Sequence, residues 1–276
     1  MHAIRDFIKN TDLKTKLHDE HEPIKDEEFF RAQCLRGFDR LVALKDKYRN
    51  KPALVAGLGP SLLEIEKEKY DSFLKIVCND FDLVPGFFDD NFKPDFWCGA
   101  NSLWALERVF SVCMERDIDC FITIPKKTEF EELLSRFEKQ EDKILPWIWE
   151  HRVFQHMLAS KYNLRSIYSH CNTITNHMIG FALWLGCNPI HVTGFDLSYV
   201  AAVEETGRTH AGFTIDYVEN DTHGDLNRFD DHQEKTQIMN DLRHMCAIAY
   251  KNGIEIHNLS FEKNKLPYNL SYEIKK

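Results

Sequence analysis

Short apolar runs, each followed by a turn and a helical pattern, recur along most of the chain. Apolar residues predict strands at residues 53–56, 74–78, 96–99, 120–124, 190–193 and 254–257. Apolar positions at helical spacing predict helices at residues 102–115, 128–139, 173–186 and 234–253. Strands that alternate with helices are typical of an α/β fold. We therefore expect a Rossmann-like, doubly wound, mainly parallel sheet with helices on both faces.

Two regions depart from this alternation. Phe30, Phe38 and Leu44 belong to one apolar helical stripe, so we expect residues 1–50 to form an N-terminal helical extension to a main domain at 51–276. Residues 198–231 show no clear periodicity. A loop of that length in a compact domain is usually functional or mobile, so this segment is a candidate for carrying chemistry.

Composition narrows the class of protein. The 276 residues include 44 acidic and 35 basic side chains, for a net charge of −9, whereas duplex-binding proteins usually carry a basic excess. We therefore expect no nucleic-acid partner. No apolar run approaches the ~18–20 residues of a membrane span, and the first residues lack a secretory signal, which predicts a soluble, cytoplasmic protein. The eight cysteines show no metal-type spacing and predict neither structural zinc nor a disulfide framework.

Polar residues follow four of the predicted strands, at the edge where doubly wound sheets bind ligands. After the first strand comes the GxGPS turn, formed by Gly57, Gly59, Pro60 and Ser61. Its glycines permit close backbone approach, and N–H groups at the following helix start can hold a phosphate. The turn lacks the third glycine of a GxGxxG fingerprint and the GK[ST] of a P-loop, so a plain strand-to-helix turn is the structural alternative.

Asparagines follow the second and third predicted strands. Asn79 and Asp80 come after the second, and Asn101 and Ser102 come after the third. An asparagine amide both donates and accepts hydrogen bonds, which suits the edge of a base or a ribose hydroxyl. The same residues are also common helix N-caps, so ligand binding and capping both stay open.

The fourth polar strand end leads into the aperiodic loop. Gly194 and Asp196 come directly after the strand at 190–193. A histidine in such a loop can take a proton from an attacking hydroxyl, whereas carboxylates can hold a divalent ion against nucleotide phosphates. The loop supplies histidines and carboxylates as well as other polar groups, namely Tyr199, Arg208, His210, Asp216, Asp221, His223, Asp225, Asp230, Asp231 and His232.

In this order, the four segments resemble the 6-hydroxymethylpterin diphosphokinase MptE-like family. That family includes the motility accessory factors implicated in flagellin glycosylation, and it is related in fold to bacterial sialyltransferases. The resemblance extends from about residue 44 to residue 259. It is most specific in KDKYRNKPALVAGLGPSL, in GFDLSYVAAVEETGRTHAG, and in the pair CND and NSL. It implies that residues 51–276 form a nucleotide-binding transferase domain.

The resemblance also implies roles for individual residues. The family's glycine loop falls on Gly57, Gly59, Pro60 and Ser61. Two asparagines that contact the nucleotide in the sialyltransferase branch match Asn79 and Asn101, with Ser102 adjacent, and a polar turn ahead of the GxD strand matches Thr173. The catalytic-base histidine of that branch matches His223. The accessory-factor pattern GxDL…THA falls on Gly194, Asp196, Leu197, Thr209, His210 and Ala211.

The chain departs from the sialyltransferase pattern at two places. Leu58 replaces an asparagine of the glycine loop, which removes one nucleotide contact. The tyrosines that steady the departing phosphate in that branch have only Tyr199 as an approximate counterpart in this chain. The resemblance therefore implies the fold more firmly than the activity.

The preferred hypothesis is a nucleotide-dependent glycosyltransferase. It would move a nonulosonic sugar, of the sialic or pseudaminic acid type, from a CMP-sugar donor to a glycan, glycolipid or protein acceptor. His223 would accept the acceptor's proton, Tyr199 or Arg208 would steady the leaving phosphate, and His210 would orient the loop or the substrate. This chemistry requires no metal or further cofactor, and the hypothesis leaves the oligomeric state open.

Two alternatives belong to other classes. The first is pyrophosphoryl transfer from ATP to a hydroxymethyl pterin, for which Mg²⁺ would be held by carboxylates such as Asp196 and Asp80. The second is a non-catalytic nucleotide- or glycan-binding protein of a glycan-assembly cluster, which the loss of asparagine at Leu58 favours.

Overall fold

The computed structural model describes residues 27–87, 92–99, 103–123, 144–147, 157–162, 173–197 and 232–273. Within these residues, seven strands form one sheet in the order β5-β4-β3-β2-β1-β6-β7, and every neighbouring pair is parallel. The sheet confirms the predicted Rossmann-like α/β class. Its strands are β1 Ala53–Ala56, β2 Leu74–Cys78, β3 Phe96–Gly99, β4 Asp119–Thr123, β5 Ile144–Trp147, β6 Ile190–Thr193 and β7 Ile256–Asn258.

Four strands have the predicted bounds, and three require correction. β4 begins one residue earlier than expected. β7 begins two residues later, because the N–H of Ile254 donates to Ala249 O (2.9 Å) at the end of the preceding helix and that of Glu255 donates to Asn188 Oδ1 (3.0 Å). β5 was not predicted. It contains a proline, which lacks a ladder donor and is tolerated here because β5 lies at the edge of the described sheet.

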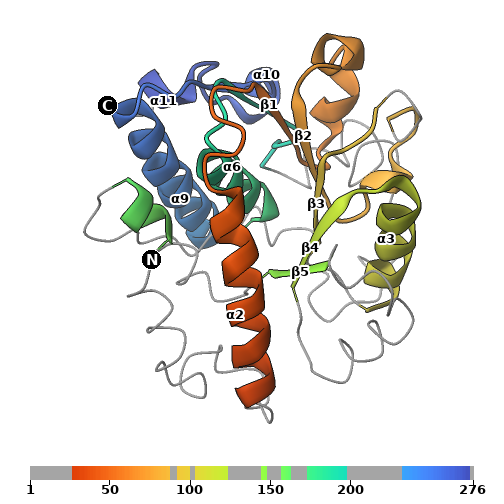
Figure 1. The fold of residues 1–276 in the computed structure, drawn as a ribbon. Helices are drawn as coiled ribbons and strands as arrows, with labels where there is room; N and C mark the ends of the chain where they lie inside the picture. The colour runs from red at the N-terminus through yellow and green to blue at the C-terminus, as the bar shows by residue number, and fades with distance from the viewer. Residues whose placement is uncertain are drawn as a thin grey trace.

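The longer helices agree with the apolar periodicity, and short helical segments connect them to the strands. The predicted helix at 128–139 lies outside the described residues. Figure 1 shows α6 and α9 on one side of the sheet and α3 on the other. The helices are α2 Glu27–Leu44, α3 Leu103–Arg116, α6 Ile174–Leu185, α9 His232–Lys251, α10 Phe261–Asn264 and α11 Leu270–Glu273, with 3₁₀ turns η1 Pro60–Glu64, η2 Lys67–Tyr70 and η3 Phe81–Leu83.

Helix α6 is the centre of the core. It packs against β1, β2, β3 and β6 on one side and against α9 on the other, so every residue from 175 to 185 is buried. A helix enclosed on all sides is apolar all round, as the segment from 178 to 185 is. Its bounds follow from its ends. Thr173 Oγ1 accepts a hydrogen bond from Asn176 N, and Gly186 stops the helix in the left-handed conformation (φ 83°).

The end of α2 belongs to the same core. Phe38, Leu41 and Leu44 are buried, and the indole Nε1 of Trp184 donates to Leu41 O at 2.6 Å. The turn after α2 continues these contacts, since Asp46 N donates to Trp184 O at 3.1 Å. The predicted amphipathic helix therefore exists, and its last turns pack on the sheet domain. The division at residue 50 stays a prediction.

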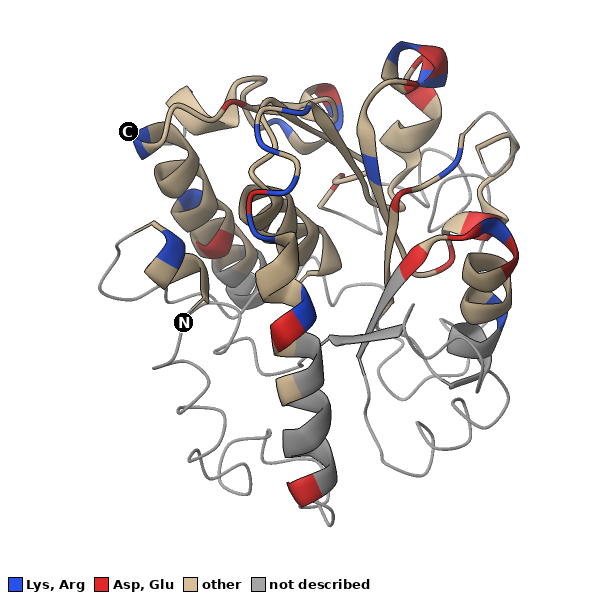
Figure 2. Cartoon of the chain, viewed as in Figure 1, with Lys and Arg blue, Asp and Glu red and all other residues tan. Residues whose placement is uncertain are grey.

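Charged residues of both signs occur along the described part of the chain, as the composition indicates. Acidic and basic residues are interspersed along the described ribbon (Figure 2). None of the described helices has the length and apolar character that crossing a membrane requires.

Candidate functional site

The candidate site lies where the strand order changes direction. From β1 the chain proceeds through β2, β3, β4 and β5 on one side, then returns to place β6 and β7 on the other side of β1. Doubly wound sheets bind ligands beyond the carboxyl ends of the strands at such a switch point. Gly57 directly follows β1 and Gly194 directly follows β6. Two of the segments selected from the sequence are therefore neighbours in space.

The two glycines bring the backbones of these turns into close contact. Gly57 N donates to Thr193 O at 2.8 Å, and Gly59 N donates to Gly194 O at 2.9 Å. A Cβ on Gly57 would lie 2.4 Å from Gly194 O, and a Cβ on Gly194 would lie 2.1 Å from Gly57 O. Gly194 also has φ +65°, which L side chains rarely adopt. We call this contact, between residues 57–61 and 193–196, the glycine seam.

Asp196 joins the seam through its side chain. Its Oδ2 accepts a hydrogen bond from Ser61 N at 3.0 Å, and a Cβ on Gly59 would lie 2.1 Å from the same oxygen. Burial raises the pKa of Asp196, and hydrogen bonds from Ser61 partly offset that rise. The other oxygen, Oδ1, is buried and has no hydrogen-bond partner among the described residues.

These contacts correct one expectation about the GxGPS turn. The N–H groups of Gly57, Gly59 and Ser61 all donate to acceptors within the chain, as does that of Leu62 to Gly59 O. They are not the open phosphate cradle that the strand-turn-helix pattern suggests. A ligand would meet other atoms of this turn, and nucleotide contacts by Gly57, Gly59, Pro60 and Ser61 stay a prediction.

A serine from a distant segment completes the seam. The hydroxyls of Ser61 and Ser260 lie 2.7 Å apart, and both side chains are buried. Gly194 N donates to Ser61 Oγ at 3.1 Å, and Phe195 N donates to Ser260 Oγ at 3.2 Å. Ser260 is not among the site residues predicted from the sequence. The signal was present, because Asn258 and Ser260 are polar residues at the end of a predicted strand, as Asn79 and Asn101 are.

The turn after β2 is held by its backbone. Asn79 has φ +44°, a region that asparagine enters more readily than most residues. Its N–H donates to Cys98 O at 3.0 Å, and its carbonyl accepts from Trp97 Nε1 at 2.9 Å. The asparagine thus has a local structural reason to be there, and its half-buried side chain lies at the ligand-binding edge of the sheet.

Asp80 has a different role from the one considered for it. Its carboxylate is buried and forms an ion pair with Arg108 of α3, whose Nε also lies 2.8 Å from Asp82 Oδ2. Burial raises the pKa of Asp82, while the charge of Arg108 acts in the opposite direction. The Asp80 carboxylate therefore ties the turn to α3, which disfavours it as a magnesium ligand.

The start of α6 faces the glycine seam. Thr175 Oγ1 lies 3.0 Å from the position that a Cβ on Gly57 would take. Thr173, predicted as a binding residue, caps this helix by accepting from Asn176 N at 3.2 Å. The buried side chain of Asn176 donates to Ile238 O at 3.1 Å and so links this end of α6 to α9. Thr173 has a structural role next to the predicted site, and a ligand contact stays a prediction.

The remaining predicted residues lie outside the described part of the chain. They include the predicted proton acceptor, the second histidine of the loop and the groups proposed to steady the leaving phosphate. They are Asn101, Ser102, Tyr199, Arg208, His210 and His223.

Comparison with known proteins gives matches among solved structures. No protein-family model matches the chain, and no curated protein matches it. The sialyltransferase CstII from Campylobacter jejuni in complex with cytidine-5'-monophosphate is 19% identical, with a TM-score of 0.43 over 78% of this chain and 82% of that one. The same enzyme with CMP-3FNeuAc is 16% identical (TM-score 0.43; 77% and 83% covered). The apo form of an alpha-2,3-sialyltransferase from Campylobacter jejuni is 15% identical (TM-score 0.44; 82% and 84%). Similarity at this level assigns no activity to this chain.

Proposed function

We propose that the chain is a nucleotide-dependent glycosyltransferase that uses a CMP-activated nonulosonic acid. The observation that carries this proposal is the meeting of the GxGPS turn and the GFD turn at the switch point, with Asn79 one strand away. A sheet of this class binds nucleotides at this place, and the same three segments carry the resemblance to the MptE-like and sialyltransferase group. Membership of the MptE-like family itself is part of the proposal.

Each group has a role in the proposed reaction. The Asn79 amide would contact the base or ribose, and the start of α6 would face the phosphate, where helix N–H dipoles favour negative charge. The acceptor oxygen would attack the anomeric carbon while His223 takes its proton, and CMP would leave with the electrons of the broken bond. Tyr199 or Arg208 would steady the departing phosphate, and Asn101 and Ser102 would complete the nucleotide contacts.

Binding and hydrolysis of CMP-, UDP- and GDP-sugars by the wild-type protein test this proposal. We expect binding and slow hydrolysis of a CMP-sugar in preference to the other two. A specific thermal shift with one nucleotide would exclude an inert scaffold, because a ligand at ~100 times its Kd adds about 2.7 kcal/mol of stability. Failure to bind or hydrolyse any of the three donors would remove the proposal.

The assignment of the base has its own test. We expect His223→Ala to lower kcat by about 10²–10⁴-fold with little change in nucleotide affinity, because a general base acts mainly in the transition state. His210→Ala is the matched control, for which we expect KM to rise at least as much as kcat falls. Near wild-type turnover of His223→Ala would move the search for the base to Asp196 or His210.

Pyrophosphoryl transfer from ATP is separated from sugar transfer by its need for a metal. Of the two carboxylates considered for Mg²⁺, Asp80 is paired with Arg108 and Asp196 accepts from Ser61 N. We therefore rank this activity second. Full transfer activity in EDTA would eliminate it, whereas activity that is lost in EDTA and restored by Mg²⁺ would favour it over sugar transfer.

A further inference from the structure

We propose that Ser260 is a positioning residue of the candidate site, acting through Ser61 on Asp196. The inference rests on the proposed function in one respect, namely that the glycine seam borders the nucleotide. Ser260 comes from the segment after β7, 199 residues from its partner Ser61. Ser260 is not among the residues to which the proposed function assigns a role.

Two hydrogen bonds connect Ser260 to Asp196 through Ser61. Ser61 Oγ accepts from Gly194 N, and Ser260 Oγ accepts from Phe195 N, so both oxygens have a backbone donor. The two hydroxyls share a further hydrogen bond of 2.7 Å, in which either can be the donor. Ser61 donates its N–H to Asp196 Oδ2 at 3.0 Å. A chain Ser260–Ser61–Asp196 results, whose first link joins the two hydroxyls and whose second link joins the Ser61 backbone to the carboxylate.

The segment that carries Ser260 is itself anchored to the seam. Asn264 Nδ2 donates to Phe195 O at 2.8 Å, so Phe195 is held at its N–H by Ser260 and at its carbonyl by Asn264. Lys263 Nζ lies 3.1 Å from Glu64 Oε1 at the end of η1. Asn258 Oδ1 accepts from Ser260 N at 3.1 Å, which sets the serine's own backbone. The segment that carries Ser260 therefore holds Phe195, the residue before Asp196, at two points and contacts the end of η1 at a third.

Because its serines are buried, the hydrogen-bond chain Ser260–Ser61–Asp196 is sensitive to the loss of a single hydroxyl. Ser61 and Ser260 are each 1% exposed, so a hydroxyl that loses its partner has no water to replace it. Without the Ser260 hydroxyl, Ser61 Oγ loses its hydroxyl partner and Phe195 N loses its acceptor. The turn that carries Asp196 would then be held less rigidly against the GxGPS turn, and a nucleotide bound beside it would lose a fixed partner.

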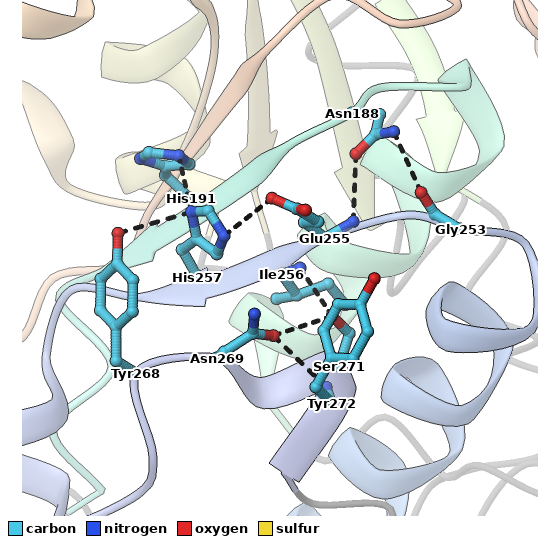
Figure 3. A network of polar contacts seen from close by, with 10 residues as sticks. All are labelled: Asn188, His191, Gly253, Glu255, Ile256, His257, Tyr268, Asn269, Ser271 and Tyr272. Atoms are coloured by element: carbon cyan, nitrogen blue, oxygen red, sulfur yellow. Dashed lines mark hydrogen bonds and ion pairs between the residues drawn. The ribbon is translucent and has the colours of Figure 1, made fainter.

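Ser271 offers a matched control in the same C-terminal segment. It is also buried (0% exposed), accepts a backbone N–H from Ile256 at 3.2 Å and donates to Asn269 Oδ1 at 3.1 Å. Figure 3 shows this contact at the first residue of β7, whereas Ser260 lies two residues beyond the last residue of that strand. Alanine at either position removes the same chemistry, so a difference between the two variants reports on location.

The first experiment measures CMP affinity by calorimetry for the wild type, Ser260→Ala, Ser271→Ala, Asp196→Asn and the double variant Ser260→Ala/Asp196→Asn. We expect Ser260→Ala to weaken binding about 5–10-fold, as the loss of one buried hydrogen bond does, and Ser271→Ala to weaken it less than about twofold. If Ser260 acts through Asp196, the double variant binds about as weakly as Asp196→Asn alone. Equal losses in the two serine variants, or additive losses in the double variant, would overturn the inference.

The second experiment does not depend on nucleotide binding. Amide hydrogen exchange of Phe195 and Gly194 is measured in the ligand-free protein. We expect Ser260→Ala to speed their exchange about 5–10-fold relative to Ser271→Ala, since each amide loses support from the hydroxyl pair. Ser260→Thr retains the hydroxyl and should restore slow exchange, and Ser260→Cys replaces the alanine variant if that variant does not fold. Failure of wild-type binding would count against the proposed function alone, and unchanged exchange would overturn the role of Ser260.

Discussion

The glycine seam and the outer edge of the sheet satisfy their polar groups in different ways. In the seam, backbone N–H groups donate to carbonyls, serine hydroxyls and one carboxylate over distances from 2.8 to 3.2 Å. At the edge, His191 of β6 and His257 of β7 form a cluster with Glu255 and Tyr268 (Figure 3), which we call the histidine cluster. The donors of the seam are mainly backbone N–H groups, whereas the contacts of the cluster join side chains.

Short polar contacts and ring stacking hold the histidine cluster together. His257 Nε2 lies 3.2 Å from Glu255 Oε2. His257 Nδ1 lies 3.1 Å from His191 Nε2, so one of these two nitrogens carries the hydrogen that joins the rings. The ring of Tyr268 stacks on His257. Burial, and next the neighbouring His257, lower the pKa of His191 to about 4.

This difference shows how one sheet can combine a fixed site with a pH-sensitive edge. Apart from the bond to the Asp196 carboxylate, the hydrogen bonds of the seam join backbone groups and serine hydroxyls, which do not titrate at neutral or mildly acidic pH. The histidine cluster is destabilised on acidification, because a proton on His191 places a positive charge on a partly buried ring beside a second histidine. Substitutions in the seam should therefore lower stability through steric contacts, whereas substitutions in the histidine cluster should change how stability depends on pH.

The largest expected effect comes from adding one carbon to the seam. We expect Gly194→Ala to lower the free energy of unfolding by about 2–4 kcal/mol, because its Cβ would lie 2.1 Å from Gly57 O in a left-handed conformation. Gly253 is the control. It has the same φ of +65° but nothing within 4 Å of its Cβ position, so alanine there should cost only about 1–2 kcal/mol of backbone strain. Chemical denaturation measures both, and equal losses would show that the contact with Gly57 contributes nothing.

Removal of the charge that supports the Asn79 turn should have the next largest effect. Arg108→Met leaves the buried Asp80 carboxylate without its cation, and we expect a loss of about 2–3 kcal/mol. Arg40→Met removes a more exposed pair with Asp119 (31% and 33% exposed) and should cost less than about 1 kcal/mol. If the two substitutions cost the same in urea denaturation, the buried pair has no special role in holding the turn.

Acidification should reveal the histidine cluster. His191 has a folded pKa of about 4 against an ordinary value of 6.5, so stability is full above pH 6.5 and falls as the pH decreases from 6.5 to 4. The group is partly exposed, so we expect its share of the loss to be about 1–2 kcal/mol after screening. The groups that face it are His257, Tyr70 and Phe73, with Glu255 and Tyr268 beyond His257.

His191→Phe should flatten the pH dependence of the unfolding free energy between pH 6.5 and 4. His244→Gln, at an exposed position of α9, should leave the slope unchanged. A slope that persists in His191→Phe would assign the acid sensitivity to another group.

The smallest expected effect separates capping from binding at Thr173. We expect Thr173→Ala to cost about 1 kcal/mol of stability through loss of the N-cap, and Thr173→Ser to restore most of it. If Thr173 only caps, CMP affinity follows stability in both variants. A loss of affinity in Thr173→Ser at wild-type stability would show a direct contact of the threonine side chain with the nucleotide.

The local sequence pattern predicts a helix or strand well where the segment itself contains the residues that start it, bury it and end it. Helix α6 has a capping threonine, an apolar body and a terminal glycine within 14 residues, so its bounds follow from the sequence. The strands β1, β2, β3 and β6 are short apolar runs bounded by turns. The polar residues that follow them stand out in the sequence as candidates for ligand binding. β5 was missed, because a proline within four residues gives no strand signal and only its place at the edge makes it acceptable.

The amino-acid sequence by itself therefore determined the α/β class, most strand and helix bounds, and the residue types at the strand ends. Tertiary structure alone decided that β6 lies beside β1, that Asp196 takes the N–H of Ser61, that Asp80 pairs with Arg108, and that Ser260 reaches the seam. The physical reason is the separation along the sequence of the residues that interact. Periodicity and capping depend on residues within a few positions of each other, whereas these contacts join residues from 28 to 199 positions apart and depend on the order in which strands pair.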